Sequence, residues 1–121
     1  MSVRVQREDF DPGAEIARLH EGRSDTGAVV GFVGLVRGES HGEALTSMTL
    51  EHFPGMTERE LARIADEARE RWQLNAVAIV HRYGELKPGE RIVLVVTAAT
   101  HRRSAFEAGE FLMDYLKTKA P

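Results

Sequence analysis

The most constraining feature of this sequence is an apolar run of eight residues, IVLVVTAA, from Ile92 to Ala99. The run is rich in β-branched residues and shorter than a typical buried helix, so it predicts a strand at the centre of a sheet. A second β-rich run, from Gly27 to Arg37, predicts another strand. Buried strands of this kind need a layer packed against them, which the rest of the chain must supply.

Shorter patterns place the remaining strands and turns. Alternating or apolar stretches predict strands over residues 2–7, 45–52 and 76–83. The polar stretch 38–43 predicts a loop, and Lys87-Pro88-Gly89-Glu90 predicts a tight turn. With three helices the order becomes β-α-β-β-α-β-β-α. This order predicts an α+β fold, a mixed and largely antiparallel sheet with helices packed on it.

The three helices are expected from their start signals. Asp11 followed by Pro12 is typical of an N-cap and a first helical residue, and Gly22 is expected to end that helix. Two capping boxes predict the other starts, at Thr57-x-x-Glu60 and Ser104-x-x-Glu107. The last helix carries an apolar stripe that is either core or a subunit contact, formed by Phe106, Gly109, Met113 and Leu116.

Composition limits the function more than the fold. The net charge of −3 gives no global basic field for a nucleic-acid backbone, so any anion site must be local. The absence of cysteine excludes disulfides, thiolate metal sites and any sulfur or acyl group carried on a Cys of this chain. The histidines show no metal-binding spacing, so we expect no metal and no cofactor. Without a secretory signal or an apolar run of about 20 residues, we expect a cytoplasmic protein with no membrane contact.

The junction after the apolar run carries three basic side chains, His101, Arg102 and Arg103, at the start of the last helix. Free N–H groups at a helix start bind anions, and Arg adds bidentate hydrogen bonds. One interpretation is therefore a local site for a phosphate or carboxylate. The alternative is a solvated turn whose charges pair with Glu107 and Glu110.

Three other basic residues also allow a functional interpretation and an interpretation as ordinary surface charges. Lys117 and Lys119 fall in the last turn of that helix, where cations complement the helix dipole. A catalytic lysine would instead need partial burial. Arg37 ends an apolar strand and opens a polar loop, a place used by site residues and by ordinary surface arginines alike.

Four longer stretches resemble the large, catalytic subunit of molybdopterin synthase. They are GAVVGFVGLVRG (27–38), LEHFPGMTE (50–58), VHRYGELKPGE (80–90) and THRRSAFEAGEFLMDYLKTKAP (100–121). They cover most of the chain in the family's order. The resemblance implies an α/β hammerhead-like fold and a sulfurtransferase of molybdenum cofactor biosynthesis. That enzyme converts cyclic pyranopterin monophosphate into molybdopterin by adding the two sulfurs of the dithiolene.

The resemblance also implies partners. Sulfur arrives as a thiocarboxylate on the C-terminal Gly-Gly of a small, ubiquitin-like subunit, whose tail enters a pocket of the large subunit. Large subunits pair as a homodimer, and a small subunit at each outer end gives a heterotetramer. Two features of the residues agree with this. A chain without cysteine must receive its sulfur on a partner, and a phosphate-bearing substrate needs a compact basic site in an acidic chain.

Roles carry over by position from the family's motifs. Lys117 matches the essential lysine, which is expected to position the thiocarboxylate and stabilise the oxyanion at its acyl carbon, or to act as an acid–base group when neutral. Arg37 matches an active-site arginine, and His101 with Arg102 matches a pair that binds substrate phosphate or pterin. Two further substrate-binding residues are expected, Arg103 at a less fixed position and Met113 as a lining residue of the same pocket.

The sequence departs from the family at its end. Family members continue with Phe-Trp, a second active-site lysine and a tail whose arginine reaches the neighbouring protomer's site, whereas this sequence stops at Pro121. We expect residues 1–121 to form a single catalytic domain without that tail, cut from a longer natural protein. If the truncation is real, the alternative is a non-catalytic module that docks the partner and binds an anion. A third alternative, an unrelated phosphate-binding regulatory domain, would have no reason to bind a protein ending in Gly-Gly.

Overall fold

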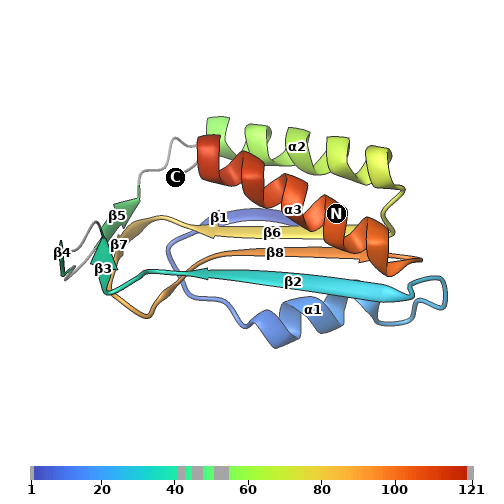
Figure 1. The fold of residues 1–121 in the computed structure, drawn as a ribbon, viewed down its shortest axis with the longest axis horizontal. Helices are drawn as coiled ribbons and strands as arrows, with labels where there is room; N and C mark the ends of the chain where they lie inside the picture. Colours follow the sequence, from blue (N-terminus) through green and yellow to red (C-terminus); the bar gives the residue numbers. More distant parts are fainter. Residues whose placement is uncertain (1, 41–42, 45–47, 51–54, 120–121) are drawn as a thin grey trace.

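A four-stranded mixed sheet organises the computed structural model, which describes residues 2–40, 43–44, 48–50 and 55–119 (Figure 1). The strand order is β1-β6-β8-β2. β1 (Ser2–Gln6) runs parallel to β6 (Ala76–Arg82), which is antiparallel to β8 (Arg91–Ala99), itself antiparallel to β2 (Ala28–Leu35). The predicted α+β class is confirmed, and the apolar run forms a strand with a neighbour on each side.

Helices cover both faces of this sheet. α2 (Met56–Trp72) and α3 (Arg102–Lys119) lie side by side on one face, and the shorter α1 (Pro12–His20) lies on the other (Figure 1). Side chains of β6 and β8 alternate between the two layers, as strand geometry requires. Val77, Ile79, Val93 and Val95 pack toward α2 and α3, whereas Ala78, Val80, Leu94 and Val96 pack with Phe10 toward α1. None of the helices in the described ranges is long and apolar enough to cross a membrane.

Two local predictions are confirmed by hydrogen bonds. The Asp11 side chain accepts from the backbone N of Ala14 at 3.2 Å, and α1 begins at Pro12. In the turn after β7 (Gly84–Leu86), the backbone N of Glu90 donates to the Lys87 carbonyl at 3.0 Å. Gly89 has φ +89° there, a conformation that side chains other than glycine rarely adopt.

Both expected capping boxes are wrong in position. α2 begins at Met56 with Gly55 as N-cap, and the Glu58 carboxylate accepts from the Gly55 backbone N at 3.0 Å. α3 begins at Arg102, so Ser104 lies inside its first turn. Glu107 accepts instead from the indole Nε1 of Trp72 at 3.2 Å. A Glu three residues after a cap recurs by chance in a charged chain, so tertiary contacts decide which signal is used.

Within the expected loop over 38–43 and the expected strand over 45–52, the described residues include short strands. β3 (Glu39–Ser40) pairs with β4 (Glu43–Ala44), so the polar stretch contains strand residues. β5 (Met48–Leu50) pairs antiparallel with β7, which the sequence patterns missed. Residues 41–42, 45–47 and 51–54 lie outside the described residues. These small ladders lie beside the end of the main sheet where β2 and β6 finish (Figure 1).

Gly27 permits the start of β2 to approach the segment that leads into α3. Its backbone N donates to the Ala99 carbonyl at 2.9 Å, and a Cβ added at Gly27 would lie 2.2 Å from the Thr100 carbonyl oxygen. We expect Gly27→Ala to lower the free energy of unfolding in urea by about 1–3 kcal/mol, because the backbones must separate. Gly13→Ala is the matched control, since its Cβ would meet only Asp11 Oδ1 at 3.4 Å. Equal stability of the two variants would contradict the close approach.

Candidate functional site: two ends of one helix

The expected site residues lie at opposite ends of α3. Arg102 opens the helix and Lys117 lies fifteen residues later. At a rise of 1.5 Å per residue they are about 22 Å apart along the axis. Arg37 follows β2, which finishes at the sheet end away from Ala99 and the start of α3. We call His101, Arg102 and Arg103 the helix-start cluster, and Arg37, Met113 and Lys117 the lysine end.

The helix-start cluster is exposed and has no countercharge. His101, Arg102 and Arg103 form no ion pair or side-chain hydrogen bond with any described residue, and the first turn of α3 contains no acidic residue. The expected pairing with Glu107 is wrong, because Glu107 accepts from Trp72, and none forms with Glu110 within the described ranges. The Thr100 hydroxyl holds the preceding turn by donating to the Asp25 carbonyl at 3.1 Å. Uncompensated cations at a helix start suit an anion.

Lys117 is exposed in the last part of α3, and Met113 lies half-buried one turn before it. The spacing of four residues puts both side chains on one flank of the helix. The described residues of this single chain do not provide the partial burial that the catalytic interpretation of Lys117 requires. A catalytic role for Lys117 would therefore need cover from outside the described residues.

Arg37 is exposed, but its backbone is fixed by its neighbours. The buried Val36 donates its N–H to the Glu90 carbonyl at 2.9 Å and accepts from the Gly89 N–H at 2.9 Å. The register between β2 and β8 shifts at Gly34 and Leu35, where the regular ladder ends. The turn over 87–90 therefore holds the segment that carries Arg37.

The sequence patterns missed a network that joins α2 and α3 near Lys117. The Tyr115 hydroxyl donates to the Glu60 carboxylate and accepts from Arg63 Nη2 at 3.0 Å. Arg63 also pairs with Glu60 at 3.2 Å. The hydrogen bond to Glu60, and secondarily partial burial, raise the pKa of Tyr115 above its ordinary value of 10.0. The helical periodicity does not indicate this network, because its residues come from two helices.

This raised pKa gives a spectroscopic prediction. The chain has two tyrosines, so Tyr83→Phe leaves only Tyr115 to ionise. We expect its phenolate absorbance to rise with a midpoint above pH 10.0, because the neutral phenol is the form that donates to Glu60. Adding Glu60→Gln should bring the midpoint back toward the value of the urea-unfolded chain. Identical midpoints for the folded and unfolded Tyr83→Phe protein would contradict the network.

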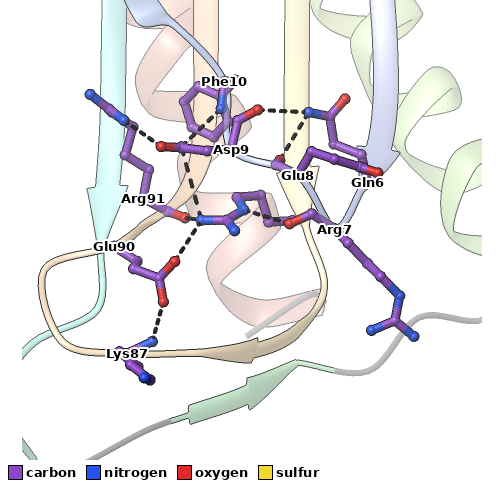
Figure 2. A network of polar contacts seen from close by, with 9 residues as sticks. Gln6, Arg7, Glu8, Asp9, Phe10, Lys87, Glu90 and Arg91 are labelled. Carbon is purple, nitrogen blue, oxygen red and sulfur yellow. Dashed lines mark hydrogen bonds and ion pairs between the residues drawn. The ribbon is translucent and has the colours of Figure 1, made fainter.

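A second missed network surrounds Arg82 at the end of β6 (Figure 2). Its Nε donates to the Arg7 carbonyl at 2.9 Å, and its Nη1 donates to the Arg91 carbonyl at 3.0 Å. Nη1 also contacts Glu90 Oε1 at 3.4 Å. An arginine closing the apolar stretch AVAIVHR was the available sequence signal, but its partners are distant in sequence.

Three large apolar side chains are exposed, two on the edge strand β2 and one near the start of α3. β2 is an edge strand, and no described strand pairs with its outer side. Phe32, Leu35 and Phe106 are 43%, 54% and 62% exposed. Of the expected stripe, Gly109 and Leu116 are buried and Met113 is half-buried, whereas Phe106 is exposed. The other buried residues of α3 are Ala105, Ala108 and Leu112. We call Phe32, Leu35 and Phe106 the edge surface.

The lysine-bearing flank of α3 faces this edge. Phe106, Met113 and Lys117 recur at intervals of seven and four residues, so they share one side of the helix. The opposite flank is occupied by α2, which contacts Glu107, Phe111 and Tyr115. Among the described residues, no three His, Asp or Glu side chains gather where a metal ion could sit.

Comparisons with known proteins agree on one family. A family model described as "MoaE protein" matches residues 5–119. A relative named molybdopterin synthase catalytic subunit, from Mesorhizobium japonicum, is 58% identical over 120 residues, covering 99% of this chain and 74% of the relative. The solved structure of a molybdopterin biosynthesis MoaE protein from Burkholderia ambifaria superposes with a TM-score of 0.89 at 50% identity, covering 99% of this chain and 78% of that one.

A more distant structure shares the fold alone. It is a complex of subunits 1 and 2 of the molybdopterin-converting factor from Helicobacter pylori. The likeness has a TM-score of 0.79 at 19% identity and covers 98% of this chain and 80% of that one.

Proposed function

The chain belongs to the MoaE protein family, and from this membership we propose that it is the catalytic subunit of a molybdopterin synthase. It transfers sulfur from the C-terminal thiocarboxylate of a small ubiquitin-like partner to cyclic pyranopterin monophosphate, forming the dithiolene of molybdopterin. It works in the cytoplasm, as a homodimer with a small subunit on each protomer. The observation that carries this proposal is that a chain without cysteine offers cations at both ends of α3 that form no ion pair with any described residue.

Each cation cluster has a distinct task in this reaction. Sulfur leaves its carrier only when the bond between sulfur and the acyl carbon breaks. The thiocarboxylate sulfur first bonds to a substrate carbon and displaces an oxygen there, and water then attacks the acyl carbon, so that the carrier leaves as its carboxylate and the sulfur stays on the substrate. The attack by water puts negative charge on the acyl oxygen, which the Lys117 ammonium stabilises. Arg37 binds the substrate beside Lys117, and Met113 lines the same pocket. His101 and Arg102, with Arg103 at the margin, hold the phosphate at the free N–H groups of the helix start.

A single chain does not place the residues for these tasks in one site. The two clusters are about 22 Å apart along α3, too far for one small substrate to contact both. The site is therefore shared, with the lysine end of one protomer completed by the helix-start cluster of its partner. This arrangement also supplies the cover that exposed Lys117 lacks.

The β2 edge supports such a pairing. An open apolar edge strand is a template for a second strand, and a two-fold axis makes the contact antiparallel and self-complementary. Ala28 lies level with Ala99 and the start of α3, whereas Leu35 lies at the other end of the sheet. Antiparallel pairing of two β2 strands therefore sets the helix-start cluster of each protomer beside the lysine end of the other. It also buries the edge surface.

The test is product formation. The chain is mixed with its thiocarboxylated partner and the pyranopterin precursor, and dithiolene product is followed by mass spectrometry. We expect product, and none when the partner ends in an ordinary carboxylate. Tight binding of the partner without product, even after the family's C-terminal tail is added, would favour the docking module instead.

A further inference from the structure

The Arg82 network ends at the segment that carries Arg37, and we infer that Arg82 is a positioning residue for Arg37. The inference rests on the proposed function, in which Arg37 binds the pyranopterin substrate. Arg82 ends β6, whereas Arg37 follows β2, and the Arg82 guanidinium donates to the carbonyls of Arg7 and Arg91. It acts through the turn over 87–90, without contact with substrate.

Arg82 is a buried cation whose hydrogen bonds fix its direction. Its side chain is 9% exposed. Two of its donors point to the carbonyls of Arg7 and Arg91 at 2.9 and 3.0 Å, and Nη1 also lies 3.9 Å from Asp9 Oδ1. A planar guanidinium donates along several fixed directions at once, which a lysine ammonium on its flexible stem cannot reproduce. The group therefore locks the chain before α1 to the turn that enters β8.

Glu90 passes this constraint into the turn. One carboxylate oxygen contacts Arg82 Nη1 at 3.4 Å, and the other accepts from the Lys87 backbone N at 2.6 Å (Figure 2). The same turn is closed by the backbone bond from Glu90 to Lys87 at 3.0 Å. Arg82 thus determines how the 87–90 turn is oriented relative to the sheet.

The 87–90 turn also fixes the residue before Arg37. Val36 exchanges two backbone hydrogen bonds with Gly89 and Glu90, each of 2.9 Å. On the other side, a Cβ at Gly38 would lie 4.0 Å from Pro88 Cβ. The ladder with β8 has already ended at Leu35. A shift of the turn therefore moves Arg37, and even a shift of about 1 Å is enough to weaken a substrate contact strongly.

A double-mutant cycle with Arg37 separates positioning from a merely structural role. We expect Arg82→Lys to raise KM for the pyranopterin precursor about tenfold while kcat and partner affinity change less than about twofold. In an Arg37→Ala background, the same change should alter KM by less than about twofold, because nothing is left to position. Equal KM effects in both backgrounds would overturn the inference, and so would an Arg82→Lys protein with unchanged KM.

Two further variants keep the test decisive. Arg91→Gln is the matched control: Arg91 belongs to the same network, but its side chain pairs with exposed Asp9 at 2.7 Å, away from the turn, so KM should stay unchanged. Glu90→Gln weakens the same contact from the side of the 87–90 turn. If Arg82→Lys folds poorly, the effect of Glu90→Gln on KM should show the same dependence on Arg37. If Arg37→Ala leaves KM unchanged, the role of Arg37 in the proposed function fails together with the inference. If Arg37→Ala raises KM but the coupling is absent, only the inference fails.

Discussion

Lys117→Ala should lower kcat for dithiolene formation by about 10²–10³-fold, the usual effect of removing one oxyanion-stabilising group. The ammonium of Lys117 is the only cation of the lysine end that we assign to the reacting carbonyl. KM should change much less, because the proposed function assigns phosphate binding to the helix-start cluster. Single-turnover measurements with thiocarboxylated partner would report the chemical step directly.

The controls for this variant separate two roles for Lys117. Arg69→Ala removes an exposed cation from α2 and should leave kcat unchanged. Lys117→Arg keeps the positive charge, so it should retain part of the activity if Lys117 acts electrostatically. It should be as inactive as Lys117→Ala if a neutral amine moves a proton, since arginine stays charged. A Lys117→Ala protein with wild-type kcat would remove Lys117 from the mechanism.

Two variants that are inactive on their own should give an active protein when one chain of each forms a mixed dimer. One chain carries His101→Ala and Arg102→Ala, and the other carries Lys117→Ala. In a mixed dimer, the intact Lys117 of the first chain meets the intact helix-start cluster of the second, which gives one complete site. Random mixing makes half of the dimers mixed, so we expect about a quarter of wild-type activity.

A second mixture tests whether recovery follows this geometry. The proposed function places Arg37 and Lys117 of one chain in the same site, so Arg37→Ala mixed with Lys117→Ala should show no recovery. Mixing is done by unfolding and refolding together, with mixed dimers counted by native mass spectrometry. Mixed dimers without activity in the first pair would contradict a shared site. Equal recovery in both pairs would contradict the assignment of residues to the two ends.

The sequence predicted the elements whose signal is local and strong. The run from Ile92 to Ala99 became the central strand because its apolar side chains suit burial on both faces. Asp11 became an N-cap because its neighbour Pro12 fixes the first helical residue. The strands β3, β4 and β7 were missed because two or three residues carry no period of their own, and their pairing depends on partners elsewhere in the chain.

The sequence predicted which residues belong to the candidate site, but it did not predict how they are arranged in space. The length of α3 already separated Arg102 from Lys117, but a list of matching positions does not show distance. Arg82 was not selected, because an arginine is ordinarily exposed and the partners of Arg82 are distant in sequence. The role of Arg82 follows only from the structure, in which its guanidinium contacts Arg7, Glu90 and Arg91.

The length of α3 has a consequence for how this chain can vary in evolution. With a cluster at each end, the helix sets a fixed spacing between two charge groups. One residue inserted between them would lengthen the helix by about 1.5 Å and turn Lys117 by about 100° around the axis, away from the edge surface. Insertions and deletions should therefore be tolerated in the exposed segment 21–25 and excluded from α3, whose register with β2 matters more than the identity of most of its exposed residues.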